Sequence, residues 1–426
     1  MMNLYDELVW RGMVSEATEG LAELLARESV TAYIGFDPTA SSLHVGSLLT
    51  VMGLARLQRF GHNPIAIVGG GTGMIGDPSG KSQERKLLSR EQLEENVAGI
   101  RRQLERFLDF EAGPNPARIV NNVDWLASFD LLGFLRDTGK HFTVNYMLQK
   151  ESVNRRLESE EGISYTEFSY LLLQARDFLE LFDRYGCTLQ MGGSDQWGNI
   201  TAGIDLIRRL RAKKAHGLVW PLMTTASGGK FGKTEAGTIW LDPERTSPFQ
   251  LYQFWLNTED RDVVKYLKLF TFLDRSAIGE LEAATASAPE KREAQRVLAR
   301  EVTTLVHGTD EVEKAIRGSE QLFNKNPWVL SVEDRLNSLA DVPSSNVTMQ
   351  QLEEKPLVQW LVDTSLASSR SEATRLILGG GIYVNDVAEK DPKRKLTAAD
   401  VWEKVLVVLG KGRRQKHVLK VDRKDD

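Results

Sequence analysis

The sequence predicts an α/β protein with a parallel sheet in its first half, then an all-helical part and a small α+β part at the C-terminus. Three observations support this prediction. Apolar strand-like runs alternate with helix-like runs as far as residue 225. From Thr246 to about Lys325 the pattern is helical and shows no clear strand. From Lys355 onward, fifteen Lys and Arg stand against ten Asp and Glu, a surplus of five positive charges.

The composition limits the class of protein. A chain of 426 residues is too long for a single core, and 41% hydrophobic with 27% charged residues is ordinary for a soluble protein. One cysteine, Cys187, excludes an intramolecular disulfide and a multi-cysteine zinc site, and fits a reducing, cytoplasmic compartment. The opening "MMNLYDELVWRG" has no long apolar stretch, so we expect neither a signal peptide nor a membrane span.

The elements of the first half follow in order. "VTAYIGFDP" and "PIAIVGGG" are short apolar runs that predict buried strands. Between them, "SSLHVGSLLTVMGLARLQRF" predicts a helix with Ser41 or Ser42 as its N-cap. "SREQLEENVAGIRRQLERFL" opens with Ser89 and Gln92 at capping-box spacing, which predicts another helix. "CTLQMGGSDQWGNITAGIDLIRRL" predicts a strand, a glycine turn and a helix.

The second half changes character twice. "TSPFQLYQFWLN" to "EQLFNK" is helical, and "DVPSSNVTMQQLEEKP" is rich in Pro, Ser and Asn, as linkers often are. "LVQWLVDTSLASSRSEATRLILGGGIYVNDV" predicts two short helices, a glycine turn and a strand. The expected parts are a sheet domain, a loop with linker, a helical domain, a linker and a basic domain, at residues 1–225, 226–245, 246–330, 331–354 and 355–426.

One glycine motif is misleading. "GTGMIG", Gly71 to Gly76, matches the dinucleotide pattern G-x-G-x-x-G after a strand. That motif requires a helix to begin at the last glycine, and here Pro78 and Gly80 follow. We therefore expect a loop that approaches a ligand closely, rather than a nicotinamide site.

Two motifs suit phosphate binding. In "SLHVGSLL", His44 and Gly46 stand at a predicted helix N-terminus, whose free N–H groups and dipole favour anions. In "GGKFGKTEAG", Lys230 and Lys233 with Thr234 occupy a glycine-punctuated loop, which can close over phosphates and release them. The alternatives are a half-buried histidine and a solvated basic turn.

Two further motifs suit a small polar ligand. In "EFSYLLLQARDFLEL", Tyr170, Gln174 and Asp177 share one stripe of a helix. This stripe fits a zwitterion with a hydroxyl group, although a solvent face is the alternative. In "MGGSDQWGN", Asp195 and Gln196 follow a strand, where open α/β sheets bind their ligands.

Together these segments resemble the bacterial tyrosyl-tRNA synthetases, a family of class I aminoacyl-tRNA synthetases. The matching stretches are "YIGFDPTASSLHVGS", "GDPSGK", "FSYLLLQARDF", "QMGGSDQWGN" and "KFGKT", in that order. "HVGS" is similar to the family's HIGH signature, with Ser47 in place of the second histidine, and "KFGKT" is similar to its KMSKS loop. The resemblance implies a Rossmann-like catalytic domain, a helical domain on the anticodon side and a ribosomal-protein type of RNA-binding domain.

The resemblance also implies roles for individual residues. Tyr33 and Asp177 would bind the phenolic hydroxyl of tyrosine. The α-amino group would be held by Tyr170, Gln174 and Asp77, with Gln190 nearby. The residues implied on the ATP and adenylate side are Gly35, Asp37, Gly46, Ser47, Gly192, Asp195 and Gln196. The residues implied at the phosphates are His44, Thr39, Lys230, Lys233 and Thr234, with Lys81 and Arg85 reaching ATP or the acceptor end.

The implied substrates are L-tyrosine, ATP with Mg²⁺ and tRNA, with no tightly bound cofactor, no protein metal site and no membrane. The implied assembly is a homodimer, for which "WLASFDLLGFLRDTGKHFTVNYML" is a candidate interface. Three rivals remain at this stage. They are a tryptophan enzyme of the same class, a nicotinamide-dependent oxidoreductase based on "GTGMIG", and a pure RNA-binding protein based on the basic C-terminus.

Overall fold

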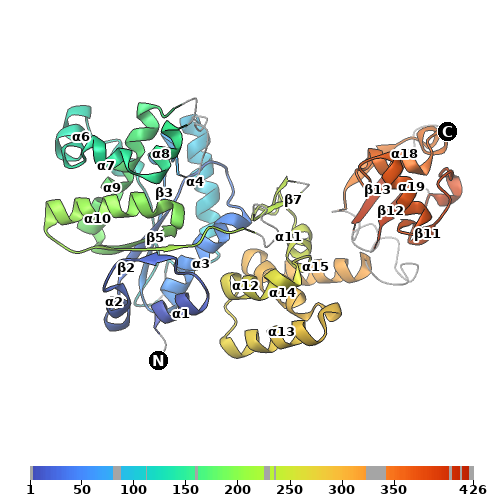
Figure 1. Cartoon of the computed structure of the whole chain (residues 1–426), viewed down its shortest axis with the longest axis horizontal. Coiled ribbons are helices and arrows are strands. Elements are labelled where there is room, and N and C mark those ends of the chain that lie inside the picture. The colour runs from blue at the N-terminus through green and yellow to red at the C-terminus, as the bar shows by residue number, and fades with distance from the viewer. Residues whose placement is uncertain are drawn as a thin grey trace. The chain divides into compact units, whose positions relative to one another are not determined.

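The computed structural model divides the chain into two compact units (Figure 1). The first comprises residues 1–246 and 254–308, and the second comprises 247–253 and 309–426. No helix among the described residues is both long and apolar enough to cross a bilayer. The residues that the structure describes are 3–79, 88–111, 113–158, 162–224, 231–234, 237–322, 342–402, 405–412 and 415–421.

The first unit contains a six-stranded sheet in the order β1-β6-β5-β2-β3-β4. All neighbours pair in parallel except β1, which is antiparallel to β6. The parallel sheet that the alternating pattern predicts is therefore confirmed. The strands are β1 (Glu16–Ala17), β2 (Thr31–Phe36), β3 (Asn63–Val68), β4 (Arg118–Asn121), β5 (Cys187–Gly193) and β6 (His216–Trp220).

Helices cover both faces of this sheet. Successive side chains of a strand point to opposite faces. Tyr33 contacts Phe178 of α9, whereas Ile34 lies beside Gly53 of α3. α9 and α3 therefore lie on opposite faces. The helices before Ala212 are α1 (Leu4–Trp10), α2 (Leu21–Arg27), α3 (Val45–Arg59), α4 (Arg90–Leu104), α5 (Val123–Leu126), α6 (Leu131–Asp137), α7 (Val144–Leu148), α8 (Glu151–Leu157), α9 (Tyr165–Tyr185) and α10 (Trp197–Arg211).

Helix α3 begins later than its sequence suggests. The expected N-cap, Ser41 or Ser42, is wrong: the helix starts at Val45 with His44 as N-cap. The reason is tertiary pairing, because Leu43 accepts a backbone hydrogen bond from Leu241 and Val45 donates one to Ile239. By contrast, Ser89 caps α4 as expected and accepts from the backbone N–H of Gln92.

The glycine loop after β3 does not start a helix. Thr72–Met74 forms a single 3₁₀ turn, and the next α-helix that the structure describes begins at Arg90. Within residues 71–79 no α-helix begins at the last glycine, which a dinucleotide fingerprint needs, as the sequence indicated.

Three further helices belong to the first unit, and two buried arginines attach one of them to the sheet domain. Arg56 is 1% exposed and donates to the carbonyl groups of Lys268, Leu269 and Thr271, at the C-terminus of α12. Arg11 donates to Lys268 and Thr271 as well, and pairs with Glu7 at 2.5 Å. These cations satisfy carbonyl groups that a helix end leaves unpaired. The helices are α12 (Asp260–Phe270), α13 (Arg275–Ser287) and α14 (Glu293–His307).

Phe231 joins the "KFGKT" segment to these helices. Its ring lies 5.3 Å from that of Phe270 in a stacked arrangement and 5.1 Å from Tyr266 in an edge-on one. The side chain is 9% exposed, so this aromatic cluster holds one end of the segment firmly. The chain continues through β7 (Lys233–Thr234), β8 (Gly237–Thr238) and α11 (Pro248–Leu256).

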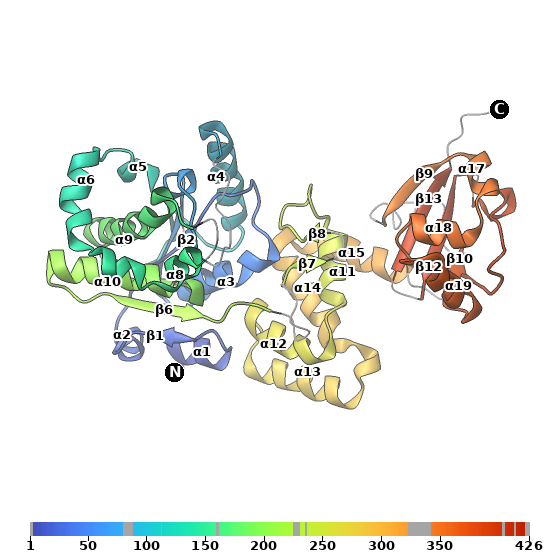
Figure 2. The same cartoon turned by 45° about the horizontal axis from the view of Figure 1, so that its top comes forward.

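The second unit contains a mixed sheet in the order β11-β10-β12-β13-β9, with helices that Figure 2 shows around it. β9 pairs in parallel with β13, and the other neighbours are antiparallel. Buried Val347 and Leu352 draw β9 and α17 into this core, although both lie within the range 331–354 expected as a linker. The elements are α15 (Thr309–Leu322), β9 (Ser344–Val347), α17 (Met349–Glu354), α18 (Leu357–Asp363), α19 (Arg370–Leu378), β10 (Ile382–Val384), β11 (Val387–Glu389), β12 (Leu406–Lys411) and β13 (Gln415–Val421).

Candidate active site

A cavity of about 470 Å³ opens at the carboxyl ends of the parallel strands. The chain runs from β2 outward to β3 and β4, then returns to place β5 on the other side of β2. Open α/β sheets bind ligands in the crevice at such a reversal. The cavity is lined by every predicted site residue whose side chain is described: Tyr33, Gly35, Asp37, Thr39, His44, Gly46, Ser47, Asp77, Tyr170, Gln174, Asp177, Gln190, Gly192, Asp195 and Gln196.

The remaining predicted residues cannot be located in the same way. Lys81, Arg85 and Lys230 lie outside the described residues. Lys233 and Thr234 form β7, and only their backbone is described.

The floor of the cavity is a buried pair of oxygen-bearing side chains. Asp177, 3% exposed, accepts hydrogen bonds from Asn122 Nδ2 at 2.9 Å and Trp125 Nε1 at 2.7 Å. The hydroxyl of Tyr33 is buried and has no hydrogen-bond partner among the described residues. A buried hydroxyl without a partner is costly, so a ligand that pairs with it gains affinity.

Burial dominates the ionisation of this region. It raises the pKa of Asp177 to about 7, although the bonds from Asn122 and Trp125 oppose the shift. Burial, and then the charge of Asp177, raises the pKa of Tyr33 well above 10. The free site therefore holds a neutral phenol beside a carboxyl that titrates near neutrality.

The middle of the cavity carries a connected polar network. Tyr170 donates to Asp37 at 2.9 Å, and Asp37 also accepts from Thr72 at 3.0 Å. Burial, and then nearby carboxylates led by Asp37, raises the pKa of Tyr170 well above 10. Asp77 accepts from the backbone of Ser79 at 2.8 Å. Donors therefore hold these two carboxylates in place at the cavity wall.

Three amides continue the network. Gln196 Nε2 donates to Asp77 at 2.8 Å, and Gln174 Nε2 donates to Gln196 at 3.2 Å. Asn199 donates to Gln174 Oε1 at 3.0 Å. The amide oxygen of Gln190 is buried and has no hydrogen-bond partner among the described residues. A ligand with a cationic donor therefore meets several oriented oxygens here.

The opposite end of the cavity is the first turn of α3. His44 is the N-cap, and its side chain makes no capping hydrogen bond. A Cβ at Gly46 would come 2.7 Å from Cε1 of His44, so a larger residue there would displace the imidazole. An anion can approach the helix N-terminus here.

The sequence analysis missed several of these residues. Asn122 and Trp125, which orient Asp177, follow β4 in the segment "NNVDW". Because they follow a parallel strand, their position at the carboxyl edge was a usable signal. Thr72 and Asn199 were also missed, although they lie within "GTGMIG" and "MGGSDQWGN".

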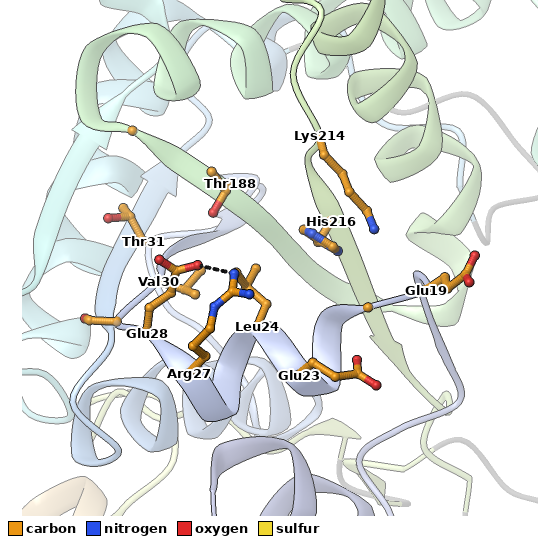
Figure 3. A pocket seen from close by; sticks show the side chains of 13 residues that line it. Glu19, Glu23, Leu24, Arg27, Glu28, Val30, Thr31, Thr188, Lys214 and His216 are labelled. Carbon is orange, nitrogen blue, oxygen red and sulfur yellow. Dashed lines mark hydrogen bonds and ion pairs between the residues drawn. The ribbon is translucent and has the colours of Figure 1, made fainter.

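A second cavity, of about 680 Å³, lies at the other end of the strands (Figure 3). Its lining mixes charges of both signs, and Arg27 is bonded to Glu28 at 2.9 Å. Thr31, Thr188 and His216 mark the amino ends of β2, β5 and β6. Since open α/β sheets bind ligands at the carboxyl ends, the first cavity is the candidate active site.

Comparison with known proteins fits this geometry. Residues 25–324 match the family described as tRNA synthetases class I (W and Y), and residues 335–419 match the tyrosine–tRNA ligase SYY-like C-terminal domain. The chain is 56% identical over 423 residues to a tyrosine–tRNA ligase of Roseiflexus castenholzii, covering 99% of this chain and 100% of the relative. For the tyrosine–tRNA ligase of Geobacillus stearothermophilus, identity is 51% over 422 residues, covering 98% and 100%.

A solved structure agrees. The crystal structure of a C-terminally truncated mitochondrial tyrosyl-tRNA synthetase of Aspergillus nidulans superimposes with a TM-score of 0.69 at 32% identity, covering 76% of this chain and 94% of that one. The two relatives above, which match over nearly the full length, are tyrosine–tRNA ligases, and this decides against the tryptophan, nicotinamide and pure RNA-binding alternatives. The chain therefore belongs to the tyrosine–tRNA ligases, a family of class I tRNA synthetases.

Proposed function

We propose that this chain activates L-tyrosine with ATP to tyrosyl-adenylate and pyrophosphate, then transfers tyrosine to the 3′-terminal ribose of its tRNA. The observation that carries the choice of amino acid is the buried pair at the cavity floor. A phenolic hydroxyl there donates to the carboxylate of Asp177 and accepts from the hydroxyl of Tyr33. Phenylalanine would leave both groups unpaired in a buried setting, which costs free energy.

The α-amino group of tyrosine is assigned to Tyr170, Gln174 and Asp77, with Gln190 nearby. An ammonium group has three N–H donors and needs oxygen acceptors. Asp77 supplies a carboxylate oriented by the backbone of Ser79, and Gln190 supplies a buried amide oxygen. The oriented network of the cavity supports this assignment.

The adenosine side is assigned to Gly35, Asp37, Gly192, Asp195 and Gln196. A Cβ at Gly35 would meet no atom within 4 Å, so open space lies above this residue. Carboxylates such as Asp195 accept hydrogen bonds from ribose hydroxyls. The glycines let a flat ligand approach the backbone.

The phosphates are assigned to Thr39, His44, Gly46 and Ser47. The carboxylate of tyrosine attacks the α-phosphorus of ATP in line, the bond to the β-phosphate oxygen breaks, and pyrophosphate leaves. No enzyme nucleophile is needed, so the rate gain comes from positioning and from donors aimed at developing negative charge. Ser47 stands where the family signature has a second histidine; its hydroxyl can donate a hydrogen bond but carries no charge.

Cations complete the phosphate site. Lys230, Lys233 and Thr234 are assigned to closure over the pyrophosphate, and Lys81 and Arg85 to ATP or the acceptor end, on the basis of the family motifs. Mg²⁺ enters with ATP as part of the substrate, because this ion usually binds through substrate phosphates rather than in an all-protein cage.

The second step uses tRNA. A terminal ribose hydroxyl attacks the carbonyl carbon of the adenylate, and AMP leaves. The basic surplus beyond Lys355 favours a polyanion partner for the C-terminal fold. A cytoplasmic location is proposed because the one cysteine, Cys187, is buried and free.

The deciding experiment is tyrosine-dependent exchange of pyrophosphate into ATP, with phenylalanine and tryptophan as controls. We expect exchange with tyrosine only, and loss of exchange in folded Asp177→Ala. Lys233→Ala should slow adenylate formation much more than it weakens tyrosine binding. Equal exchange with phenylalanine, or unchanged kinetics in Asp177→Ala, would refute the assignment of the cavity floor.

A homodimer is proposed through the helical insertion around α6. Leu131, Leu132, Leu135 and Val144 are exposed there, and Leu132 is 77% exposed. An apolar patch of this kind marks a protein interface. Sedimentation should show a dimer in the native chain and a monomer in Leu131→Asp/Leu132→Asp. Leu378→Asp, an equally apolar but unrelated exposed position, is the control, and a native monomer would contradict the proposal.

A further inference from the structure

Trp240 lies directly opposite His44, on the segment that follows "KFGKT". The two residues form an antiparallel bridge. Val45 donates a backbone hydrogen bond to Ile239 at 3.0 Å, and Leu241 donates to Leu43 at 2.9 Å. The segment that leads into α3 and the segment that leaves the loop therefore form one small two-stranded unit.

The side chains across this bridge also touch. The rings of His44 and Trp240 lie edge to face, with centroids 6.0 Å apart and planes at 67°. The imidazole also lies close to Gly46, where an added Cβ would come within 2.7 Å of it. The indole of Trp240 and the first turn of α3 thus both adjoin the imidazole and limit its orientation.

Trp240 is itself held in place. The guanidinium carbon of Arg245 lies 3.4 Å from the centroid of the indole, a cation–π contact. The backbone N–H of Trp240 donates to the hydroxyl of Thr246 at 3.0 Å, and Thr246 is buried. The ring that confines His44 therefore has a fixed backbone and a cation stacked against it.

The same unit reaches the glycine of "KFGKT". Ile239 donates a backbone hydrogen bond to Gly232 at 3.1 Å. Gly232 has φ +80°, and a Cβ there would lie 2.7 Å from Cγ2 of Val45. The base of the loop consequently sits against the first turn of α3, one residue away from His44.

We propose that Trp240 is a positioning residue for tyrosine activation, whose ring orients the imidazole of His44 and whose strand keeps the "KFGKT" loop in register with α3. Trp240 does not line the cavity, so it acts through His44 rather than on substrate. The inference rests on the proposed role of His44 at the ATP phosphates.

The test is a double-mutant cycle measured as the rate constant of adenylate formation. We expect Trp240→Leu to slow this step about tenfold or more, since small misplacements of a catalytic group cost up to about a hundredfold. Trp240→Phe, which keeps an aromatic ring at this position, should recover most of the rate. The Kd of Trp240→Leu for tyrosine should stay within about twofold of the wild-type value, since the cavity floor is untouched. In a His44→Ala background, Trp240→Leu should lose most of its effect on the rate.

Matched variants keep the test decisive. Trp10→Leu changes another half-buried indole with arginines over its ring and should leave the rate unchanged. If Trp240→Leu does not fold, Arg245→Ala loosens the same indole from the surface, and its smaller loss should also vanish in His44→Ala. Two results would overturn this inference and leave the proposed function intact. One is that the losses in rate of Trp240→Leu and His44→Ala add up in an enzyme whose wild type is active. The other is that Trp240→Leu weakens tyrosine binding as much as it slows adenylate formation. A wild-type chain without exchange, or His44→Ala as fast as wild type, would overturn the proposed function of the site and this inference with it.

Discussion

Tyrosine binding should depend steeply on pH because of Asp177. The carboxyl has its pKa raised from 3.8 to about 7 by burial. Its two oxygens already accept from Trp125 and Asn122, and a proton on either oxygen removes an acceptor that the phenol of tyrosine needs. Binding therefore requires the ionised form, whose population falls as pH drops through 7.

The magnitude follows from that pKa. The ionised fraction is about 0.9 at pH 8 and about 0.01 at pH 5, so tyrosine affinity should fall about 90-fold, or about 2.7 kcal/mol, between them. Isothermal titration calorimetry with tyrosine alone measures this. Asp177→Asn should bind weakly with no such slope, while Tyr33→Phe should bind weakly and keep it. If the affinity of the wild type for tyrosine changes by less than about threefold across this range, the reasoning is refuted.

Four other outcomes are expected. Folded Asp177 keeps its proton up to about pH 7, whereas the unfolded chain loses it near pH 4, so wild-type stability should fall by about 2.6 kcal/mol between pH 5 and pH 8. Urea unfolding at these two pH values should show the fall in the wild type and not in Asp177→Asn. Asn122→Ala removes a bond to a charged group and should weaken tyrosine binding by about 1.5–3 kcal/mol by calorimetry; an unchanged Kd would contradict the geometry. Gly46→Ala should slow adenylate formation at nearly constant tyrosine Kd, as stopped-flow fluorescence would report, because its Cβ would displace the His44 ring. Arg56→Met should lower the free energy of unfolding by about 3–5 kcal/mol in urea, against a small effect in half-exposed Arg59→Met.

The floor of the site shows what sequence patterns can and cannot predict. The stripe Tyr170, Gln174 and Asp177 was visible because helical periodicity puts i, i+4 and i+7 on one face. For Asn122 and Trp125 the sequence offers only their place after a strand, since their contact with Asp177 depends on β4 lying next to β3, a long-range pairing that no local pattern specifies. The order of strands in a sheet is a tertiary property, and so is the set of residues that meets at its edge.

Element boundaries failed for a similar reason. The start of α3 moved from Ser41 or Ser42 to Val45 because Leu43 and Val45 pair with a segment roughly 200 residues later in the chain, and this pairing outweighs a local cap. In the C-terminal unit, Ser344–Val347 has turn-like composition and yet completes the sheet beside β13. Buried Val347 is the one strong apolar residue in that strand, too little for a pattern to detect.

The two buried arginines, Arg11 and Arg56, delay part of the folding of the chain during its synthesis. Arg11 and Arg56 reach full hydrogen bonding only when the carbonyl groups of Lys268 to Leu273 exist, and for Arg11 and Lys268 the separation is 257 residues. At the usual rate of about 5–20 residues per second, the ribosome needs roughly 13–51 s to add that stretch. During this interval the guanidinium of Arg11 can pair with Glu7 but not with these carbonyl groups, and α3 cannot bury Arg56 without loss. The amino-terminal helix is thus synthesised first, but its contacts with the end of α12 form only much later. A nascent chain that stops short of α12 should therefore remain a substrate for chaperones and proteases.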